Sequence, residues 1–417
     1  MSFSSRSMKN FNKKLRSRIL STLINGKIHL PHFISHFIVF LCGLAFGIAI
    51  PSWHSKSISL NFQLNPSLNQ TQTLPSPHKL LPLEMLLLNR TSNSTGWKNL
   101  FKPPTSVYHD MEEEELLWRA SMVPNVGNST LPRAKKVAFL FLTHGPLPLA
   151  PFWDLFFKGY EDLYSVYVHS NPLFKGTVPS NSVFYGRMIP RSKVVQWGTF
   201  SVVEAERLLL ANALLDVSNQ RFVLLSDSCI PLFNFSTIYN YLMSSSKSFL
   251  EVLDVPGLVG RDRYNPRMSP TIQFHQWRKG AQWFQIDRDL AHELISDLNY
   301  FSTFQRFCNG LCFGDEHYLP SFVTVRLWRK FSNRTSTWIN WSMGGAHPFG
   351  FGEMETTREN LEWLRSYGNE GCEFNGGTNI CFLFARKFLP SSLDSLMRIA
   401  PHVMSCNFNL LIQVYAL

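Results

Sequence analysis

The residues best suited to chemistry lie in the stretch 307–319, FCNGLCFGDEHYL, where two cysteines precede an acidic pair and a histidine. Asp315 and Glu316 suit the first turn of a helix, because free backbone N–H groups and the helix dipole favour negative charge there. An ionised carboxylate held in that position is suited to act as a general base. The alternative is a capped helix whose acidic first turn is simply solvated and has no catalytic role. The features that favour a catalytic role over this alternative lie in the rest of the chain.

The cysteines of this stretch belong to a set of six that follow an apolar N-terminal segment: Cys229, Cys308, Cys312, Cys372, Cys381 and Cys406. An even number is compatible with disulfides in an oxidising compartment, although the connectivity cannot be deduced from the sequence. A zinc site is the rival interpretation for Cys308 and Cys312. The zinc interpretation is weak, because the chain after the apolar segment contains neither a CxxC nor an HxxxH pair that could supply the remaining ligands.

The positive charge of the chain is concentrated at its N-terminus. The formal net charge is +11, and residues 1–27 carry seven Lys and Arg with no acid before Glu84. Subtracting those seven charges from +11 leaves +4 for the rest of the chain. This distribution gives no support to nucleic-acid binding by the main body.

The apolar segment itself, Phe33–Ile50, has no Lys, Arg, Asp or Glu and is just long enough to cross a bilayer as a helix. A cleaved signal peptide is the competing interpretation, but its apolar run is normally shorter and ends in small residues. The positive-inside rule then predicts a cytosolic tail over 1–32, a transmembrane helix over 33–50 and a luminal remainder. We therefore expect a single-pass membrane protein.

Residues 51–132 are rich in Ser, Asn, Leu and Pro without a clean period, which predicts a luminal stem with one short helix near 110–122. Sequons for N-glycosylation support a luminal location. Seven follow the apolar segment, at Asn69, Asn89, Asn93, Asn128, Asn234, Asn333 and Asn340.

The folded body is expected from residue 133 to residue 404 and begins with alternating strands and helices. Strands are predicted at 136–142, 164–169 and 221–227, and helices at 150–159, 199–216 and 235–243. This order predicts an α/β fold with a doubly wound, mostly parallel sheet and flanking helices. The carboxyl ends of such strands bind ligands, and this places His144, His169 and Asp227 on one edge.

Two later segments offer groups for a sugar nucleotide and its acceptor. Residues 274–287 mix aromatic and cationic side chains, and we expect Trp277, Arg278, Lys279 and Trp283 to contact an acceptor, with core packing as the alternative for the tryptophans. His347, in a Gly-rich aromatic loop, is a further acceptor candidate, and a histidine that fixes the turn beside Pro348 is the alternative. A strand over 381–390 is expected to carry Arg386 and Lys387 at its carboxyl end.

Five motifs occur in a specific order over residues 136–404: LLSDSCIPL, WRKGAQWF, GDEHYLP, WSMGGAHP and CFLFARKF. In this order the chain resembles the core-2/I-branching N-acetylglucosaminyltransferase family, and more closely its plant branch. The resemblance implies a type II Golgi membrane protein with a GT-A-like domain that performs inverting transfer without a metal. The end of the chain, 405–417, does not look like the usual end of that family.

The resemblance also implies roles for individual residues. Glu316 matches the catalytic base, and Lys387 matches a cation that holds the diphosphate. Val166 and His169 match the strand end that contacts the nucleotide, and Cys372 and Cys381 match a disulfide pair. The position of a second diphosphate-binding arginine holds Thr378, and the candidates to replace that arginine are Arg386, Arg365 and Arg358.

The residues support the same mechanism independently. Metal-dependent sugar transferases neutralise the leaving diphosphate with a divalent cation, but Asp227 stands in SDSCIP without a second carboxylate one residue on. Arg386 and Lys387 can replace the metal through charge-assisted hydrogen bonds to phosphate oxygens. We therefore expect no metal cofactor.

The predicted function is transfer of a sugar, N-acetylglucosamine by the resemblance, from a UDP-sugar to a glycan or glycoprotein acceptor. One alternative is a glucuronosyl- or xylosyltransferase of the same family acting on cell-wall proteoglycan. Another is a non-catalytic luminal sugar-binding protein, which Thr378 and the unusual C-terminus suggest. A metal-dependent hydrolase is weak, because the chain has no HExxH motif.

Overall fold

The computed structural model describes residues 106–123, 134–367 and 371–404, all of which fall in one compact unit, 92–417. Within these ranges no helix is both long and apolar enough to cross a membrane. The predicted transmembrane segment 33–50, the tail 1–32, most of the stem and the C-terminal residues 405–417 lie outside the described residues. So do Cys406 and the sequons at Asn69, Asn89, Asn93 and Asn128.

A six-stranded sheet forms the centre of the body, in the order β2-β1-β3-β6-β5-β7. The first three strands are parallel, β6 is antiparallel to both β3 and β5, and β5 and β7 are parallel. Their bounds are β1 Lys136–Leu142, β2 Tyr164–His169, β3 Asn219–Ser226, β5 Ser248–Leu250, β6 Gln285–Asp287 and β7 Phe331–Asn333. The predicted α/β sheet is confirmed in its central, mostly parallel part.

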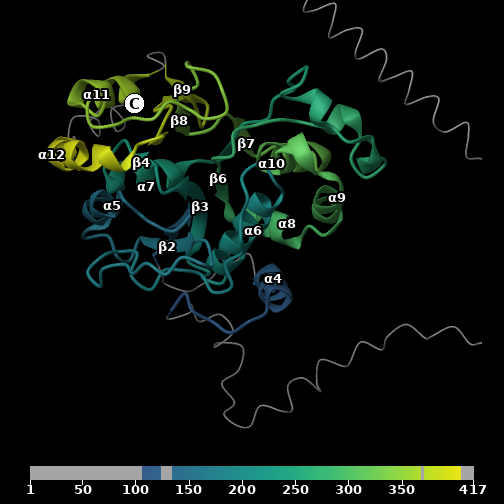
Figure 1. Cartoon of the computed structure of the whole chain (residues 1–417), viewed down its shortest axis with the longest axis horizontal. Helices are drawn as coiled ribbons and strands as arrows, with labels where there is room; N and C mark the ends of the chain where they lie inside the picture. The colour runs from purple at the N-terminus through teal and green to yellow at the C-terminus, as the bar shows by residue number, and fades with distance from the viewer. Residues whose placement is uncertain (1–105, 124–133, 368–370, 405–417) are drawn as a thin grey trace, which may run out of the picture. The chain divides into compact units, whose positions relative to one another are not determined.

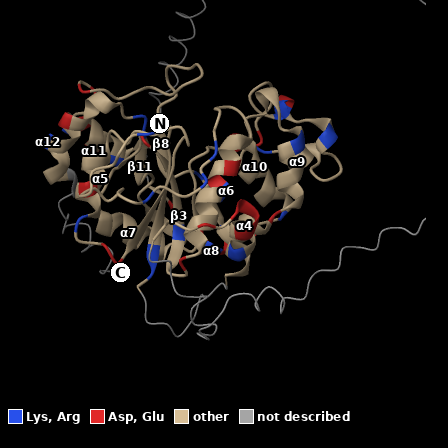
Figure 2. Cartoon of the chain, turned by 60° about the horizontal axis from the view of Figure 1, so that its bottom comes forward, with Lys and Arg blue, Asp and Glu red and all other residues tan. Residues whose placement is uncertain are grey.

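Helices cover both faces of this sheet, which explains the continuous apolar runs of β1, β2 and β3. Figure 2 shows α5, α7, α11 and α12 on one side of the sheet and α4, α6, α8 and α10 on the other. Their bounds are α4 Glu113–Met122, α5 Ala150–Phe157, α6 Ser201–Leu214, α7 Phe235–Ser244, α8 Arg288–Ser296, α10 Gly314–Val325, α11 Arg358–Ser366 and α12 Leu393–Met404.

A second, three-stranded sheet lies beside the carboxyl ends of the central strands. It has the order β4-β11-β8, with β4 Ile230–Pro231, β8 Thr337–Ile339 and β11 Phe384–Arg386. The N–H of Phe388 donates to the carbonyl of Ser228 at 2.9 Å. This pairing brings the end of β11 next to the loop that follows β3. A two-stranded hairpin, β9 Cys372–Phe374 and β10 Gly377–Asn379, completes the strands of the described chain.

The helix predicted near residues 110–122 forms as α4 and packs against α6 and α8. Leu116 and Ala120 are buried in this contact. The packed body therefore includes a helix that precedes residue 133, where the folded domain was expected to begin.

The helix α9, Asn299–Phe307, was not predicted. The carboxylate of Asp297 accepts hydrogen bonds from the backbone N–H groups of Tyr300 and Phe301 at 3.0 and 2.8 Å. An acidic residue just before a helix satisfies N–H groups that have no partner within the helix. Figure 1 shows α9 beside α8 and α10, on the part of the body that carries the acidic stretch.

Asn234, one of the predicted glycosylation sites, begins α7 as its N-cap. Its side chain accepts a hydrogen bond from the N–H of Thr237 at 2.9 Å, and the residue is only 8% exposed. In the folded body this burial disfavours a glycan on Asn234, whose glycosylation stays a prediction. The amides of Asn333 and Asn340 also bond to backbone groups, but Asn333 is exposed and Asn340 is half-buried, so both stay predictions.

Asn234→Ala is expected to lower the free energy of unfolding by about 1 kcal/mol, because the variant loses the cap of α7. Asn234→Asp keeps an acceptor oxygen and is expected to retain wild-type stability. Denaturant unfolding of the three proteins measures the difference. Both variants should migrate like the wild type on a gel, and a mobility shift that endoglycosidase treatment removes would show that Asn234 carries a glycan after all.

Candidate active site

Glu316 lies in the first turn of α10, and two cations contact its carboxylate. The guanidinium Nη1 of Arg263 donates to Oε2 at 2.6 Å, and the ammonium of Lys279 donates to the same oxygen. No described residue contacts Oε1 through a hydrogen bond or ion pair. Because the two cations hold the carboxylate from one side, Oε1 is available to an incoming hydroxyl.

The backbone around Glu316 is fixed by close contacts that exclude side chains. Gly314 lies under the ring of Phe200, and a Cβ at this position would stand 2.6 Å from that ring. Gly280 donates its N–H to the carbonyl of Glu316 at 2.8 Å, and a Cβ there would meet the carbonyl of Glu251 at 1.9 Å. The segment WRKG therefore runs directly beside the start of α10, and this places Lys279 at the carboxylate.

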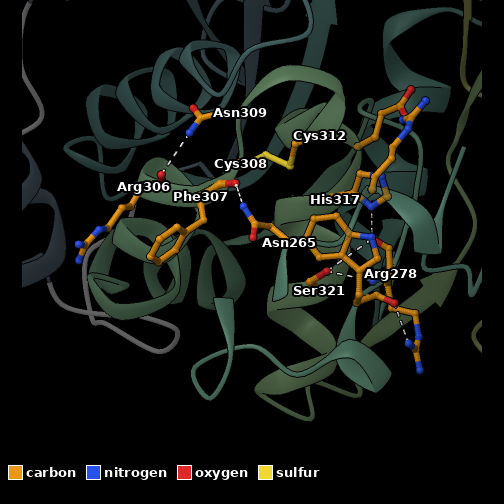
Figure 3. The surroundings of a disulfide bond; sticks show 12 residues. Asn265, Arg278, Arg306, Phe307, Cys308, Asn309, Cys312, His317 and Ser321 are labelled. Atoms are coloured by element: carbon orange, nitrogen blue, oxygen red, sulfur yellow. Dashed lines mark hydrogen bonds and ion pairs between the residues drawn. A yellow bond between two sulfur atoms is a disulfide. The ribbon is translucent and has the colours of Figure 1, made fainter. Parts of the chain in front are cut away.

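His317 is a structural residue. Its Nδ1 lies 2.7 Å from the carbonyl of Arg278, and its ring stacks on Trp277 with the ring centroids 4.4 Å apart. Burial lowers the pKa of His317 to about 4, so the imidazole is neutral near pH 7. Figure 3 shows His317 directed toward Arg278. The sequence favoured this structural role over that of a base.

Asp315, the neighbour of Glu316, points into the body instead of toward solvent. Burial raises its pKa to about 6, and the negative charge of Glu316 acts in the same direction. Burial also raises the pKa of Glu206 on α6, whose carboxylate accepts a hydrogen bond from Gln282 at 2.9 Å. The two acidic neighbours therefore have different surroundings: the carboxyl group of Asp315 faces the interior, and that of Glu316 is held by two cations.

Two disulfides form in the described chain. Cys308 and Cys312 are bonded and close the turn that leads into α10, as Figure 3 shows. This bond excludes the zinc alternative for the two residues. Cys372 and Cys381 are also bonded, which is the pair that the resemblance implied. Cys229 is a buried free thiol.

Arg386 and Lys387 lie at the end of β11 without an acidic partner. Neither side chain forms an ion pair or hydrogen bond with the residues that the structure describes. The guanidinium of Arg386 lies 4.2 Å from the ring centroid of Trp283, and its Nε is buried without a hydrogen-bond partner. Two adjacent cations of this kind, partly withdrawn from water, are suited to bind an anion.

Asp227 stands beside these cations at the carboxyl end of β3. Burial raises the pKa of Asp227, and the positive charges of Arg386, His144 and Lys387 act in the opposite direction. The register aligns Leu142 with both His169 and Ser226, so the ends of β1, β2 and β3 meet at one edge. The predicted placement of His144, His169 and Asp227 on this edge is therefore correct.

A closed ring of contacts joins Glu316 to the two cations. On one side, Lys279 contacts Glu316 and Trp283 contacts Arg386. Lys279 and Trp283 are the ends of a five-residue segment, so their Cα atoms are at most about 14 Å apart. This side of the ring of contacts links the base candidate to Arg386 through one short stretch of chain.

The other side of the ring runs through the loop 340–351. The N–H of Phe351 donates to the carbonyl of Lys387 at 2.8 Å, which ties the loop to the cations. The ring of His347 lies 5.3 Å from Trp197, and Trp197 lies 5.4 Å from Phe313. Arg263, whose guanidinium is 4.3 Å from the centroid of Phe313, closes the ring at Glu316. The predicted acceptor residues Lys279 and His347 belong to this ring of contacts.

Three predicted site residues have buried side chains. Val166 is 1% exposed and lies three residues before the end of β2, so its side chain packs in the core. Trp277 is 1% exposed, donates its indole N–H to the carbonyl of Gly260 and stacks on Phe304. Trp283 is 4% exposed and lies against Arg386. Neither tryptophan has a free face for an acceptor sugar, and core packing, the alternative interpretation, is correct for both.

His169 and Arg278 are close to the site but act on the backbone. The Nε2 of His169 accepts the N–H of Lys193 at 3.1 Å, and burial lowers the pKa of His169 to about 4. Arg278 donates through Nη1 to the carbonyls of His275 and Trp277 at 2.7 and 2.8 Å. These contacts fit residues that position the loops around the ring.

Among the candidates to replace the arginine absent at Thr378, the structure favours Arg386. Arg358 pairs with Glu362 one helical turn along α11, and both side chains are exposed. Arg365 donates through Nε to the carbonyl of Leu232. Arg386 is the candidate that directly adjoins Lys387.

Sequence reasoning missed Arg263 and Trp197. Arg263 belongs to a Gly-, Arg- and Pro-rich segment over 256–269, whose composition indicates a loop but not its partner. Trp197 stands in the polar segment before α6. An aromatic residue among polar neighbours was the one feature of the sequence that could have indicated it.

The motif order, the sheet and the ring of contacts agree with the comparison to known proteins. The family model described as "Core-2/I-Branching enzyme" matches residues 137–365, which is more than half of the chain and contains Glu316. The chain belongs to the core-2/I-branching enzyme family. It is 35% identical over 300 residues to glycosyltransferase BC10 of Oryza sativa subsp. japonica, a match that covers 62% of this chain and 74% of the relative.

As a member of this family, the chain is a glycosyltransferase. A sugar donor and a glycan acceptor follow from that class. Lys387 lies beyond the residues that the family model matches, and Glu316 lies within them. The link between Lys387 and Glu316 therefore rests on the chain of contacts described above and not on the matched segment.

Proposed function

We propose that this protein is an inverting, metal-independent glycosyltransferase with a GT-A-like domain that moves a sugar from a UDP-sugar to a glycan or proteoglycan acceptor. The observation that carries the proposal is the pair of cations Arg386 and Lys387, which form no ion pair or hydrogen bond with the described residues and are joined to Glu316 by one ring of contacts. N-acetylglucosamine is the first candidate sugar by family, and glucuronic acid and xylose are the alternatives.

The reaction is a single displacement. Glu316 Oε1 takes the proton from an acceptor hydroxyl while the hydroxyl oxygen attacks the anomeric carbon from the face opposite the diphosphate. The bond between the anomeric carbon and the phosphate oxygen breaks, and its electron pair leaves with UDP. Arg386 and Lys387 stabilise the negative charge that develops there. One displacement inverts the configuration at the anomeric carbon.

The ion pairs of Glu316 support its role in this scheme. Arg263 and Lys279 fix the orientation of the carboxylate through Oε2. The three side chains are between 14% and 27% exposed, so their interaction is only partly screened by water. A fixed carboxylate with one open oxygen satisfies the geometric requirement for a base.

The proposed location is the Golgi membrane, with residues 33–50 as a single-pass anchor and the body in the lumen. Two disulfides support an oxidising compartment. The basic residues before position 28 support a cytosolic N-terminus.

The experiment that tests the proposal is turnover by the purified full-length chain of UDP-N-acetylglucosamine, UDP-glucuronic acid and UDP-xylose. We expect one donor to release UDP in the presence of a galactoside acceptor, with inversion at the anomeric carbon seen by NMR. Failure with every donor, or retention of configuration, would contradict the proposed reaction.

The same assay tests independence of metal. The initial rate in excess EDTA is expected to equal the rate with manganese, because side-chain cations replace the metal at the diphosphate. A rate that EDTA abolishes and manganese restores would refute this part of the mechanism.

A further inference from the structure

Trp197 presents an aromatic surface beside the proposed base that packing does not explain. The residue is 55% exposed, although it touches two other rings, Phe313 at 5.4 Å and His347 at 5.3 Å between centroids. The interplanar angles of these contacts are 67° and 43°, so neither ring is stacked flat against the indole. A large part of the indole therefore remains open to a ligand.

The position of Trp197 is fixed by the turn that contains it. Gly198 has a φ of +80°, and a Cβ there would lie 3.2 Å from the ring of Phe313. The hydroxyl of Thr199 donates to the carbonyl of Gln196 at 2.8 Å, and the N–H of Gln196 donates to the hydroxyl of Ser201 at 3.0 Å. These bonds hold the indole in place before any ligand arrives, which lowers the entropic cost of binding.

Trp197 reaches Glu316 through one intermediate ring. Phe313 directly precedes α10, and Arg263 lies over its ring while donating to the carboxylate of Glu316. Trp197 is 55% exposed, whereas the side chains of Glu316 and Arg263 are 27% and 14% exposed. The cations Arg386 and Lys387 belong to the opposite part of the ring of contacts. Trp197 therefore presents an open aromatic face that is joined to the proposed base through Phe313 and Arg263.

We infer that Trp197 is a stacking platform for a pyranose ring of the acceptor, with His347 at its edge. This inference rests on the proposed function, since it takes Glu316 as the group that receives the acceptor proton. An aromatic face binds the C–H groups of a sugar, and tryptophan supplies a large rigid surface at low entropic cost. Trp197 thereby becomes a specificity-determining residue for the acceptor, while the donor binds elsewhere.

The test compares Trp197→Ala with Trp197→Phe and with Trp118→Ala in the full-length chain. Trp118 is a matched control, because it is 57% exposed and lies on α4, whose packing partners are α6 and α8 and not the ring of contacts. Saturation-transfer NMR with methyl β-galactopyranoside, N-acetyllactosamine and galactobiose, each in the presence of UDP, measures acceptor binding without requiring turnover. Calorimetry measures the affinity for UDP separately.

We expect Trp197→Ala to weaken binding of the sugar by roughly tenfold or more, with the affinity for UDP unchanged. Trp197→Phe should retain most of the binding, and Trp118→Ala all of it. The inference is overturned if Trp197→Ala binds the sugar as the wild type does, if the wild type binds none of the three sugars, or if the affinity for UDP falls instead. A different outcome would refute the proposed function alone. In it the wild type binds the sugar but shows no transfer activity, and Trp197→Ala loses the sugar binding.

Discussion

Glu316→Gln is expected to lower the rate of sugar transfer by about 10²–10⁴-fold and to leave the affinity for UDP unchanged. The amide keeps the size of the side chain but cannot take a proton from the acceptor hydroxyl. In the proposed mechanism UDP contacts the cations at the end of β11 and not Glu316, so its binding should survive. Initial rates at saturating donor and calorimetry with UDP measure the two quantities.

The control for this variant is Glu293→Gln. Glu293 is also a glutamate in an ion pair with an arginine, Arg326 at 2.7 Å, but this pair lies on exposed side chains away from the ring of contacts. We expect Glu293→Gln to keep wild-type activity, because exposed ion pairs contribute little to stability. Substantial transfer by Glu316→Gln would remove Glu316 as the base, whatever the control shows.

Lys387→Ala is expected to weaken binding of UDP by roughly 10- to 100-fold, because it removes a charge-assisted hydrogen bond to the diphosphate. The rate of transfer at saturating donor should fall as well, since the lost charge stabilises the departing UDP. Arg386 alone then faces the phosphates. Calorimetry with UDP and initial rates over a range of donor concentrations separate the two effects.

Lys330→Ala serves as the matched control for this variant. Lys330 is a lysine with an exposed side chain that lies 3.7 Å from Asp289 and takes no part in the ring of contacts. It should bind UDP like the wild type. Equal UDP affinity in Lys387→Ala and the wild type would place the diphosphate elsewhere and would leave the cations without a role in transfer.

The elements of the central sheet could be predicted from the sequence because their signals are local. A buried parallel strand such as β1 is a continuous apolar run, and α6 shows apolar residues at helical spacing. Strand ends then follow from the turn residues, and this placed Asp227 correctly at the carboxyl edge of the parallel strands. The helix α9 was missed because its signal is one acidic cap, Asp297, at the end of the preceding helix.

The site was predicted less completely, because its contacts join segments far apart in the chain. Glu316 pairs with Arg263, 53 residues away, and no periodic pattern identifies such a partner. The composition of WRKGAQWF could not show which side chains face inward, and the structure buries both tryptophans of this segment while Lys279 reaches the base. Motif order identified the family, but exposure and pairing required the fold.

The most direct measurement of the central claim is a crystal structure of the full-length chain with UDP. The account predicts diphosphate oxygens within hydrogen-bond distance of Arg386 and Lys387, with the terminal phosphate directed toward the carboxylate of Glu316. A diphosphate bound away from these two cations, or a terminal phosphate directed away from Glu316, would contradict it.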